Sequence, residues 1–114
     1  MSDCIFCAIV EGRAPASIVY SDELCCAFMD VQPVNQGHIL VIPREHITGP
    51  QAIDGDNADV AGHLIAVSTR IARELGIAAD GYRLVLNEGR QGGQSVYHMH
   101  LHLLGGRPMG WPPG

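Results

Sequence analysis

Three histidines alternate with apolar residues near the end of the chain, at positions 98, 100 and 102. Alternate side chains of an extended strand point to the same face, so His98, His100 and His102 are expected to line one face. The side chains between them are apolar and are expected to enter the core: Met99, Leu101 and Leu103. Half of the six histidines in the chain lie within these five residues, which favours a functional surface over a polar strand face that carries histidines by chance.

Two kinds of chemistry fit such a surface. Two of the three imidazoles could share a metal ion, but the outer pair lies ~13 Å apart between Cα atoms, at the limit of reach for metal–nitrogen bonds of ~2 Å. Alternatively, imidazole has an ordinary pKa of about 6.5, is largely a free base at neutral pH, and can attack phosphorus to give a covalent intermediate. Because the sequence has no Walker-type loop and no obvious acidic magnesium cluster, metal-free chemistry at phosphorus is the simpler expectation.

The segment Gly92-Gly93-Gln94-Ser95 comes just before the histidines and supplies groups that chemistry at phosphorus needs. Attack on a phosphate ester or amide requires donors for the non-bridging oxygens and a proton for the leaving group. Glycines allow close backbone approach, so their N–H groups could hold an anion, and Ser95 and Gln94 add a hydroxyl and an amide. A Gly-Gly pair alone usually marks only a turn, but beside the histidines it predicts a phosphate site.

The cysteines form two pairs with different expectations. Cys4 and Cys7 have the CxxC spacing that lets two thiolates share a zinc ion. One such pair is only half of a zinc site, and the same spacing also fits a redox pair. Cys25 and Cys26 lie in an apolar stretch, where buried thiols are expected. The chain carries no convincing secretory signal, so we expect it in the cytoplasm, where thiols stay reduced.

The elements that must position these groups are short strands and one long helix. Apolar, β-branched runs bounded by turn residues predict strands, whereas the apolar run at 4–10 fits either a short helical turn or a strand. The predicted strands cover residues 17–20, 24–29, 37–42, 82–87 and 96–104. Strands on both sides of one helix favour an α+β fold with an antiparallel sheet.

A helix is predicted from about Asn57 to Leu75, because apolar residues recur there at spacings of three and four and form one stripe. The stripe consists of Val60, Ala61, Leu64, Ile65, Ser68, Ile71, Ala72 and Leu75. Asp54 and Asp56 are the expected N-cap residues, and Gly76 is the expected C-terminal stop.

The composition limits the class of protein. A chain of 114 residues with 46% hydrophobic and 17% charged residues fits one domain, residues 1–114, and excludes a disordered or collagen-like chain. Seven basic against twelve acidic residues argue against broad nucleic-acid binding, and no apolar run approaches the ~20 residues of a membrane span. The tail, residues 105–114, holds three prolines and the single tryptophan, and we expect it to pack near the site or on a partner subunit.

With these residues in place, the sequence resembles the histidine triad (HIT) family, whose mark is His-x-His-x-His-x-x with apolar residues between the histidines. Residues 98–104 fit this mark at every position. The match extends over nearly the whole chain, through Asp30, Pro33, Gly37, His38, Pro43, His46, Asn87, Glu88, Gly89 and residues 92–102. Residues 105–108 and 111–114 are similar to the Hint-like branch of purine nucleoside phosphoramidases, and the CxxC pair is similar to its bacterial members.

The resemblance implies an antiparallel sheet of about five strands with one main helix, in a homodimer whose subunits each bind a purine nucleotide. It implies hydrolysis of the P–N bond of purine nucleoside 5′-phosphoramidates, such as adenylate–amine conjugates. His100 would attack the α-phosphorus, and water would hydrolyse the nucleotidyl-histidine intermediate to release the nucleoside monophosphate. Two alternatives stay open: a dinucleoside polyphosphate hydrolase of the same family, and a nucleotide- or zinc-binding module with incidental catalysis.

The resemblance also implies roles for individual residues. The catalytic residues would be the nucleophile His100, the flanking His98 and His102, the proton donor Ser95, and His38. The substrate would be bound by Asp30 at the ribose hydroxyls, Asn87 at the ribose and phosphate, and Gly93, Gln94, Ser95, His100 and His102 at the phosphate.

The bacterial members that this chain resembles close a structural zinc site with two histidines. The matching residues are Cys4, Cys7, His46 and His98. The chemistry itself would require no cofactor. If His98 binds zinc, however, one of its ring nitrogens cannot also donate to the substrate.

Overall fold

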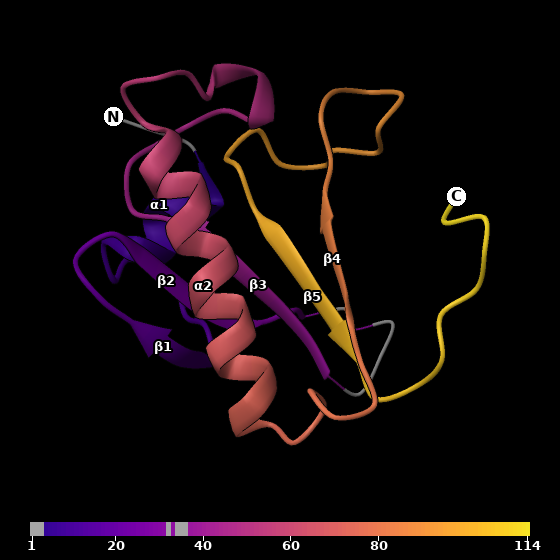
Figure 1. Ribbon diagram of the computed structural model, residues 1–114. Coiled ribbons are helices and arrows are strands. Elements are labelled where there is room, and N and C mark those ends of the chain that lie inside the picture. The colour runs from indigo at the N-terminus through magenta and orange to yellow at the C-terminus, as the bar shows by residue number, and fades with distance from the viewer. Residues whose placement is uncertain (1–3, 32, 34–36) are drawn as a thin grey trace.

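The computed structural model describes residues 4–31, 33 and 37–114, and it contains a five-stranded antiparallel sheet with helices on both faces (Figure 1). The strands are β1 (Ile18–Ser21), β2 (Cys25–Met29), β3 (Gly37–Pro43), β4 (Arg83–Leu86) and β5 (Leu101–Gly105), in the order β1-β2-β3-β5-β4. The helices are α1 (Ile5–Val10), α2 (Ala58–Glu74) and the short 3₁₀ helix η1 (Pro50–Ala52). The predicted α+β class, with five antiparallel strands and one main helix, is confirmed, and the open choice at 4–10 is settled as a helix.

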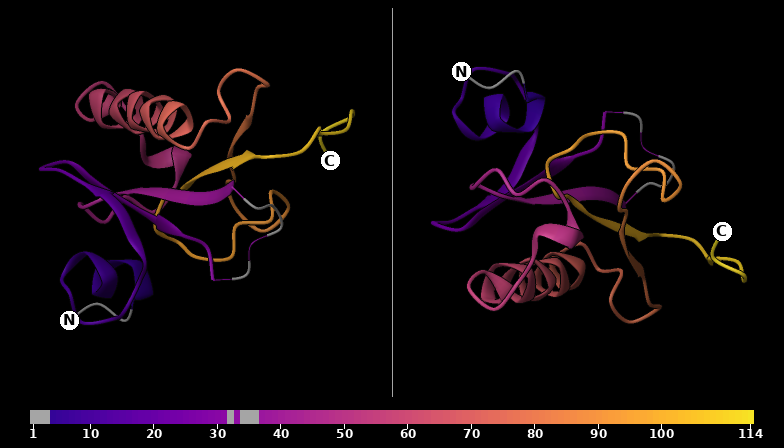
Figure 2. Two further views of the ribbon diagram at one scale, coloured as in Figure 1. Left: turned by 90° about the horizontal axis from the view of Figure 1, so that it is seen from below. Right: turned by 90° about the horizontal axis from the view of Figure 1, so that it is seen from above.

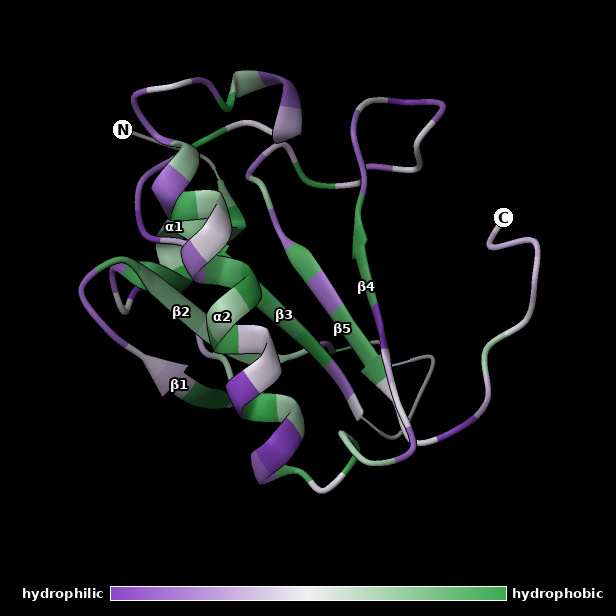
Figure 3. Cartoon of the chain, in the orientation of Figure 1, coloured by the Kyte–Doolittle hydropathy of each residue, from purple (hydrophilic) through white to green (hydrophobic). Residues whose placement is uncertain are grey.

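The sheet separates two apolar cores. Figure 2 views it close to edge on, with α2 on one face and α1 on the other. The core on the α2 side is built from Cys25, Ala27, Ile39, Val41, Ile47, Leu64, Val67, Ile71, Ala72, Met99, Leu101 and Leu103. The core on the α1 side is built from Phe6, Cys26, Phe28, Leu40 and Ile42. Because β3 is covered on both faces, its side chains from residue 38 onward are all buried, which explains the continuous apolar run in Figure 3.

Helix α2 ends as predicted but begins differently. Gly76 has a φ of 78°, the left-handed conformation of a C-terminal stop. The predicted N-caps Asp54 and Asp56 are wrong, because the N-cap position is Asn57 and the Asp54 carboxylate instead accepts the Asp56 N–H. Among the described residues, no helix is both long enough and apolar enough to cross a membrane.

The buried face of α2 is narrower than the predicted stripe. The buried residues are Leu64, Val67, Ser68, Ile71 and Ala72. The stripe prediction therefore missed Val67 and wrongly included Ile65 and Leu75, which stay 46% and 49% exposed. The sheet covers only about one third of a helix, so residues at the edges of a broad apolar stripe remain in solvent.

The histidine segment differs from the predicted strand over 96–104. Strand β5 begins only at Leu101, so of the three alternating histidines His102 alone lies within a strand. The chain before it is held by the loop after β3, where the Met99 N–H donates to Ile47 O at 2.6 Å. The two-faced arrangement nevertheless holds, since Met99, Leu101 and Leu103 all enter the core beneath α2.

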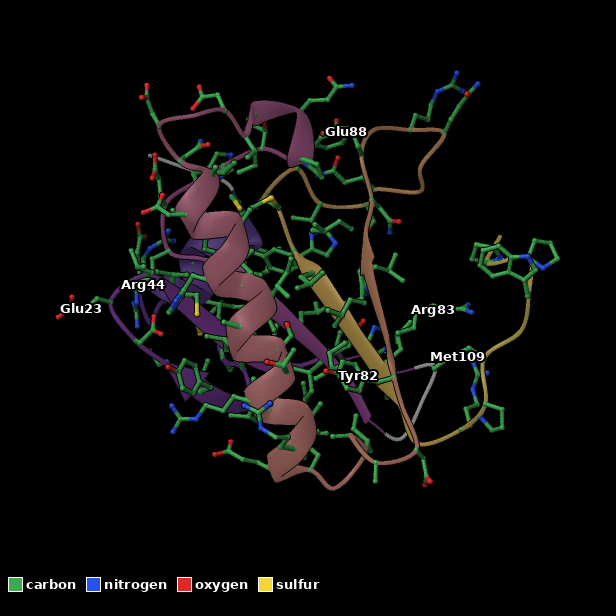
Figure 4. All side chains as sticks on the ribbon, in the orientation of Figure 1. Glu23, Arg44, Tyr82, Arg83, Glu88 and Met109 are labelled. Carbon is green, nitrogen blue, oxygen red and sulfur yellow. The ribbon has the colours of Figure 1, made fainter. Side chains whose placement is uncertain are left out.

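The tail after β5 extends away from the sheet beside β4 (Figure 1). Arg83 of β4 donates to Gly110 O at 2.7 Å, and Figure 4 shows Arg83 and Met109 on this side of the molecule. Trp111 is 85% exposed. The indole is therefore not packed on the core of its own chain.

Candidate active site

The sheet brings Asp30, His38 and His102 together on the face that α1 covers. Asp30 follows β2, His38 lies on β3, and His102 of β5 pairs in register with Leu40 of the α1-side core. The Nε2 atom of His38 lies 3.0 Å from Nδ1 of His102 and 3.2 Å from Oδ2 of Asp30. His38 Nε2 therefore lies between the Asp30 carboxylate, with which it is in ion-pair contact, and the His102 ring, with which it shares a hydrogen bond.

The carboxylate at one end of this group favours one placement of the ring hydrogens. Because a carboxylate only accepts hydrogen bonds, Nε2 of His38 carries the hydrogen that faces Asp30 and His102. Burial is the main cause that lowers the pKa of His38, and burial together with His100 and His38 lowers the pKa of His102 to about 4. Neutral His102 then accepts at Nδ1 and carries its hydrogen at Nε2, an atom that is buried and has no hydrogen-bond partner among the described residues. The site thus holds an unsatisfied donor, which an anionic ligand could satisfy.

His100 carries its ring hydrogen on Nδ1, the reverse of the arrangement in His102. Its Nδ1–H donates to His98 O at 2.8 Å, so the lone pair of the neutral ring is on Nε2. The ring is only 5% exposed and lies 5.0 Å, between centroids, from the ring of His102. The edge of Phe6 packs against it at 5.1 Å. His100 therefore has the tautomer and the fixed orientation of a nucleophile, beside the unsatisfied donor.

Both ring nitrogens of His98 have partners within the protein. Its Nε2–H donates to Pro43 O at 2.8 Å, and its Nδ1 lies 3.4 Å from Cys4 Sγ and 3.6 Å from Cys7 Sγ. The His98 ring therefore has no N–H left for a ligand, so the catalytic role expected for His98 cannot be a hydrogen bond from its side chain to the substrate. The contribution of His98 to the site is its carbonyl group, which orients His100.

The donors around His98 fit a zinc ion. Cys4, Cys7, His46 and His98 offer four ligand atoms that all lie within 4.8 Å of one another. With bonds of about 2.3 Å to sulfur and 2.05 Å to nitrogen, a tetrahedral zinc separates sulfur from nitrogen by about 3.6 Å. The sulfur–nitrogen distances here are 3.2, 3.4 and 3.6 Å. The two thiols lie at the start of α1. His46 lies in the loop after β3, and His98 lies in the segment just before β5.

A second cluster of Cys, His and Asp is a structural link. Asp22 accepts the N–H groups of Leu24 and Cys25 at Oδ1, and the Tyr20 hydroxyl and His63 Nε2–H at Oδ2. Burial is the main cause that raises the pKa of the Cys25 thiol to about 12. A fully hydrogen-bonded carboxylate beside a thiol that resists ionisation ties the β1–β2 hairpin to α2, and it needs no metal to be satisfied.

The loop before the histidines is built differently from the expected phosphate cradle. The N–H groups of Gly93 and Gln94 donate within the loop, to Arg90 O and Gly89 O. The Gln94 side chain is buried, accepts from the Gly89 N–H and donates to Thr48 O and Val96 O. Gln94 therefore holds the loop in place, and direct contacts of Gln94 and Gly93 with phosphate stay predictions. Ser95 is exposed, and Asn87 directly follows β4.

Two further residues lie at the site or beside it although neither of them was given a role from the sequence. Phe6 contacts the rings of both His98 and His100. Glu88, labelled in Figure 4, accepts the Gln51 N–H of η1 at 2.8 Å, and a Cβ atom at Gly49 would lie 2.6 Å from its Oε1. Their contacts could not be read from the sequence, because both join segments that are far apart in the chain. Only the closeness of Glu88 to Asn87 would have hinted at its place.

Comparisons of the sequence and the fold with known proteins identify the family of this chain. The family model for the HIT domain matches residues 11–109. The chain belongs to the HIT domain family. This HIT protein is 45% identical over 108 residues to the purine nucleoside phosphoramidase of Escherichia coli K12, covering 95% of this chain and 91% of that protein.

Solved structures of HIT proteins share the whole fold. A HIT family hydrolase from Legionella pneumophila has a TM-score of 0.96 and 42% identity, covering 98% of this chain and 100% of that chain. A zinc-bound histidine triad family protein from Mycobacterium smegmatis has a TM-score of 0.79 and 36% identity, covering 92% of this chain and 76% of that chain. The family resemblance read from the sequence is thereby confirmed.

Proposed function

We propose that this HIT protein hydrolyses the P–N bond of purine nucleoside 5′-phosphoramidates and releases the nucleoside monophosphate. The observation that carries the proposal is that His100 donates through Nδ1, which leaves its lone pair on Nε2, next to the ring of His102, whose buried Nε2 has no hydrogen-bond partner among the described residues and is assigned the N–H. A nucleophile beside a donor for a phosphate oxygen is what in-line attack at phosphorus needs. The 45% identity to the E. coli phosphoramidase supports the choice of substrate.

In the first step, Nε2 of His100 forms a bond to the α-phosphorus while the bond from phosphorus to the leaving amine breaks. The bonding pair stays on the amine nitrogen, which takes a proton from the Ser95 hydroxyl. The His102 Nε2–H donates to a non-bridging oxygen, and the His98 carbonyl stabilises the positive charge that develops on the His100 ring.

In the second step, water attacks the phosphorus of the nucleotidyl-histidine intermediate. The bond to His100 Nε2 breaks, its electron pair returns to the ring, and the proton of the water restores the Ser95 hydroxyl. Asp30 accepts the ribose hydroxyls while it also holds His38, and Asn87 contacts the ribose and the phosphate. The chemistry needs no cofactor in this scheme.

We also infer a structural zinc at Cys4, Cys7, His46 and His98. The geometry of the four donors fits a tetrahedral ion, and a zinc-bound relative has the same fold. Bound there, zinc would cross-link α1 to the segment before β5. Metal analysis of the purified protein, compared with a Cys7→Ser variant, tests this: about one zinc per chain is expected in the parent protein and none in the variant.

The protein is further proposed to be a homodimer joined at the β4 edge. β4 pairs with β5 alone within the described sheet, Leu86 on it is 39% exposed, and the tail with Trp111 leaves the molecule on this side. An unpaired strand edge with exposed apolar side chains is a natural surface for a second copy. Sedimentation should give a dimer that Leu86→Lys dissociates; a parent protein that sediments as a monomer refutes this.

The decisive experiment is turnover without added metal. The protein is incubated with adenosine 5′-phosphoramidate or with a diadenosine polyphosphate, beside His100→Ala and the matched control His63→Ala, a histidine outside the site. Release of adenylate from the amidate that is lost only in His100→Ala supports the proposal. Preference for the polyphosphate keeps the nucleophile and changes the substrate class. No turnover of either compound, with adenylate still bound, makes this a binding protein.

A further inference from the structure

The metal-ligand cluster and the nucleophile share one residue. His98 offers Nδ1 to the cluster and its carbonyl oxygen to the His100 Nδ1–H. The same residue is therefore a ligand on its side chain and an orienting acceptor on its backbone. The inference below deepens the proposed function, on which it rests.

Helix α1 makes a second connection between the cluster and the nucleophile. Its N-cap is Cys4, its third helical residue is Cys7, and Phe6 between them is 7% exposed. The Phe6 ring meets His100 at 5.1 Å and His98 at 5.9 Å, both edge-on. A helix of six residues is too short to be stable alone, so its place depends on its tertiary contacts.

We propose that α1 and its metal cluster act as a positioning unit for the nucleophile: a metal held by Cys4, Cys7, His46 and His98 fixes the His98 backbone and seats Phe6 against the His100 ring. Both contacts hold His100 in the one tautomer and orientation that leave Nε2 aimed at phosphorus. In this proposal His98, the cysteines and Phe6 are positioning residues that act on the reaction through His100.

The first test follows the His100 ring directly. In protein labelled with ¹⁵N-histidine, the two-bond correlations of the imidazole distinguish the two tautomers, and His100→Ala assigns the signal. With zinc bound, His100 should show one Nδ1–H tautomer with an exchange-protected proton. After chelation, both tautomers should be populated and that proton should exchange with water. An unchanged His100 signal in fully metal-free protein overturns the proposal.

Cys4→Ser gives a matched control for chelation. Serine is a good N-cap, so it can still accept the Cys7 N–H that Cys4 Sγ accepts at 3.3 Å, while the thiolate ligand is lost. The variant should therefore resemble the chelated parent protein, and chelator should have no further effect on it. If the Cys4→Ser protein still binds zinc tightly and keeps the parental His100 signal, Cys4 is not a metal ligand and the proposed four-residue cluster is wrong.

Phe6→Leu and Phe28→Leu separate positioning from packing. Both rings lie in the same core and contact each other at 5.5 Å, but the ring contacts to the histidines come from Phe6. An aromatic contact of this kind corresponds to a loss of about two- to tenfold in kcat for Phe6→Leu. Phe28→Leu should lower the unfolding midpoint similarly and leave kcat within about twofold. Equal losses of kcat in both variants overturn the role of Phe6.

The two proposals fail in different ways. If the parent protein turns over no phosphoramidate but its His100 signal depends on zinc, the proposed substrate is wrong and the positioning unit stands. If turnover is normal and neither chelation nor Cys4→Ser changes the His100 signal or kcat, the proposed function stands and the positioning unit is refuted.

Discussion

Replacing His102 with Gln should reduce the amount by which the free energy of unfolding falls at acidic pH. The pKa of His102 is lowered from 6.5 to about 4 in the folded protein, mainly by burial. Below pH 6.5 the unfolded chain binds a proton at this residue that the folded protein rejects. The free energy of unfolding must therefore fall as the pH drops from about 6.5 toward 4, and the contribution is fully present only above that range.

The magnitude follows from the shift. Each unit of pKa difference corresponds to about 1.36 kcal/mol, so between pH 7 and pH 5 His102 accounts for a loss of about 2 kcal/mol. Gln keeps a donor and an acceptor but does not titrate, so the Gln variant should lose about 2 kcal/mol less than the parent protein over the same range.

Urea unfolding at pH 7 and pH 5 measures this difference, at one protein concentration because the protein is proposed to be a dimer. The comparison of the two pH changes removes any constant effect of the substitution. Equal losses in the parent and in His102→Gln would falsify the argument, because His102 would then not be held neutral by its site.

Three further predictions concern residues that hold the site in place. Asp22→Asn weakens the acceptor for His63 and should lower the free energy of unfolding at pH 7 by about 1–3 kcal/mol in urea. Since the pKa of Asp22 is below its ordinary value because of its hydrogen bonds, the deficit should shrink below about pH 4, and a constant deficit would contradict this cause. Gly49→Ala places a methyl group 2.6 Å from Glu88 Oε1, so the Glu88 carboxylate must move away from the Gln51 N–H and the free energy of unfolding should fall by about 1 kcal/mol in urea; the loss should be smaller in a Glu88→Ala background, and equal losses in both backgrounds would exclude this clash as the cause. Gln94→Leu removes the partner of one backbone donor and two backbone acceptors and should lower the unfolding midpoint by a few degrees in calorimetry, whereas an unchanged midpoint would show that the loop does not depend on this amide.

The arrangement of the histidine segment could be predicted in part from its alternation. Polar and apolar side chains that alternate must separate to two faces whenever one face is buried, and Met99 enters the core as expected. The point where the strand begins could not be read, because it depends on a hydrogen bond from Met99 to Ile47, a residue of a distant loop. The same reason explains His98, whose ring is turned away from the nucleophile by Pro43 and the two cysteines.

The contacts by which Phe6 and Gln94 support the site could not be predicted from the sequence. Cys4 and Cys7 stand out by their spacing, but Phe6 between them reads as an ordinary core residue. Its contact with His100 joins positions 94 residues apart, and no local pattern encodes such a pair. Gln94 was noticed for its place beside the histidines, yet its buried amide bonds three backbone groups, a role that only the folded loop reveals.

The contact between Cys4 Sγ and His98 Nδ1 joins residues that are 94 positions apart in a chain of 114. Closing so long a loop costs chain entropy, so this contact cannot form early from local structure. During synthesis the N-terminal thiols leave the ribosome long before the imidazole that they meet. Until His98 has been made, Cys4 and Cys7 can therefore meet only one of the two imidazoles, that of His46, and a metal held by all four donors has to wait until most of the chain is present.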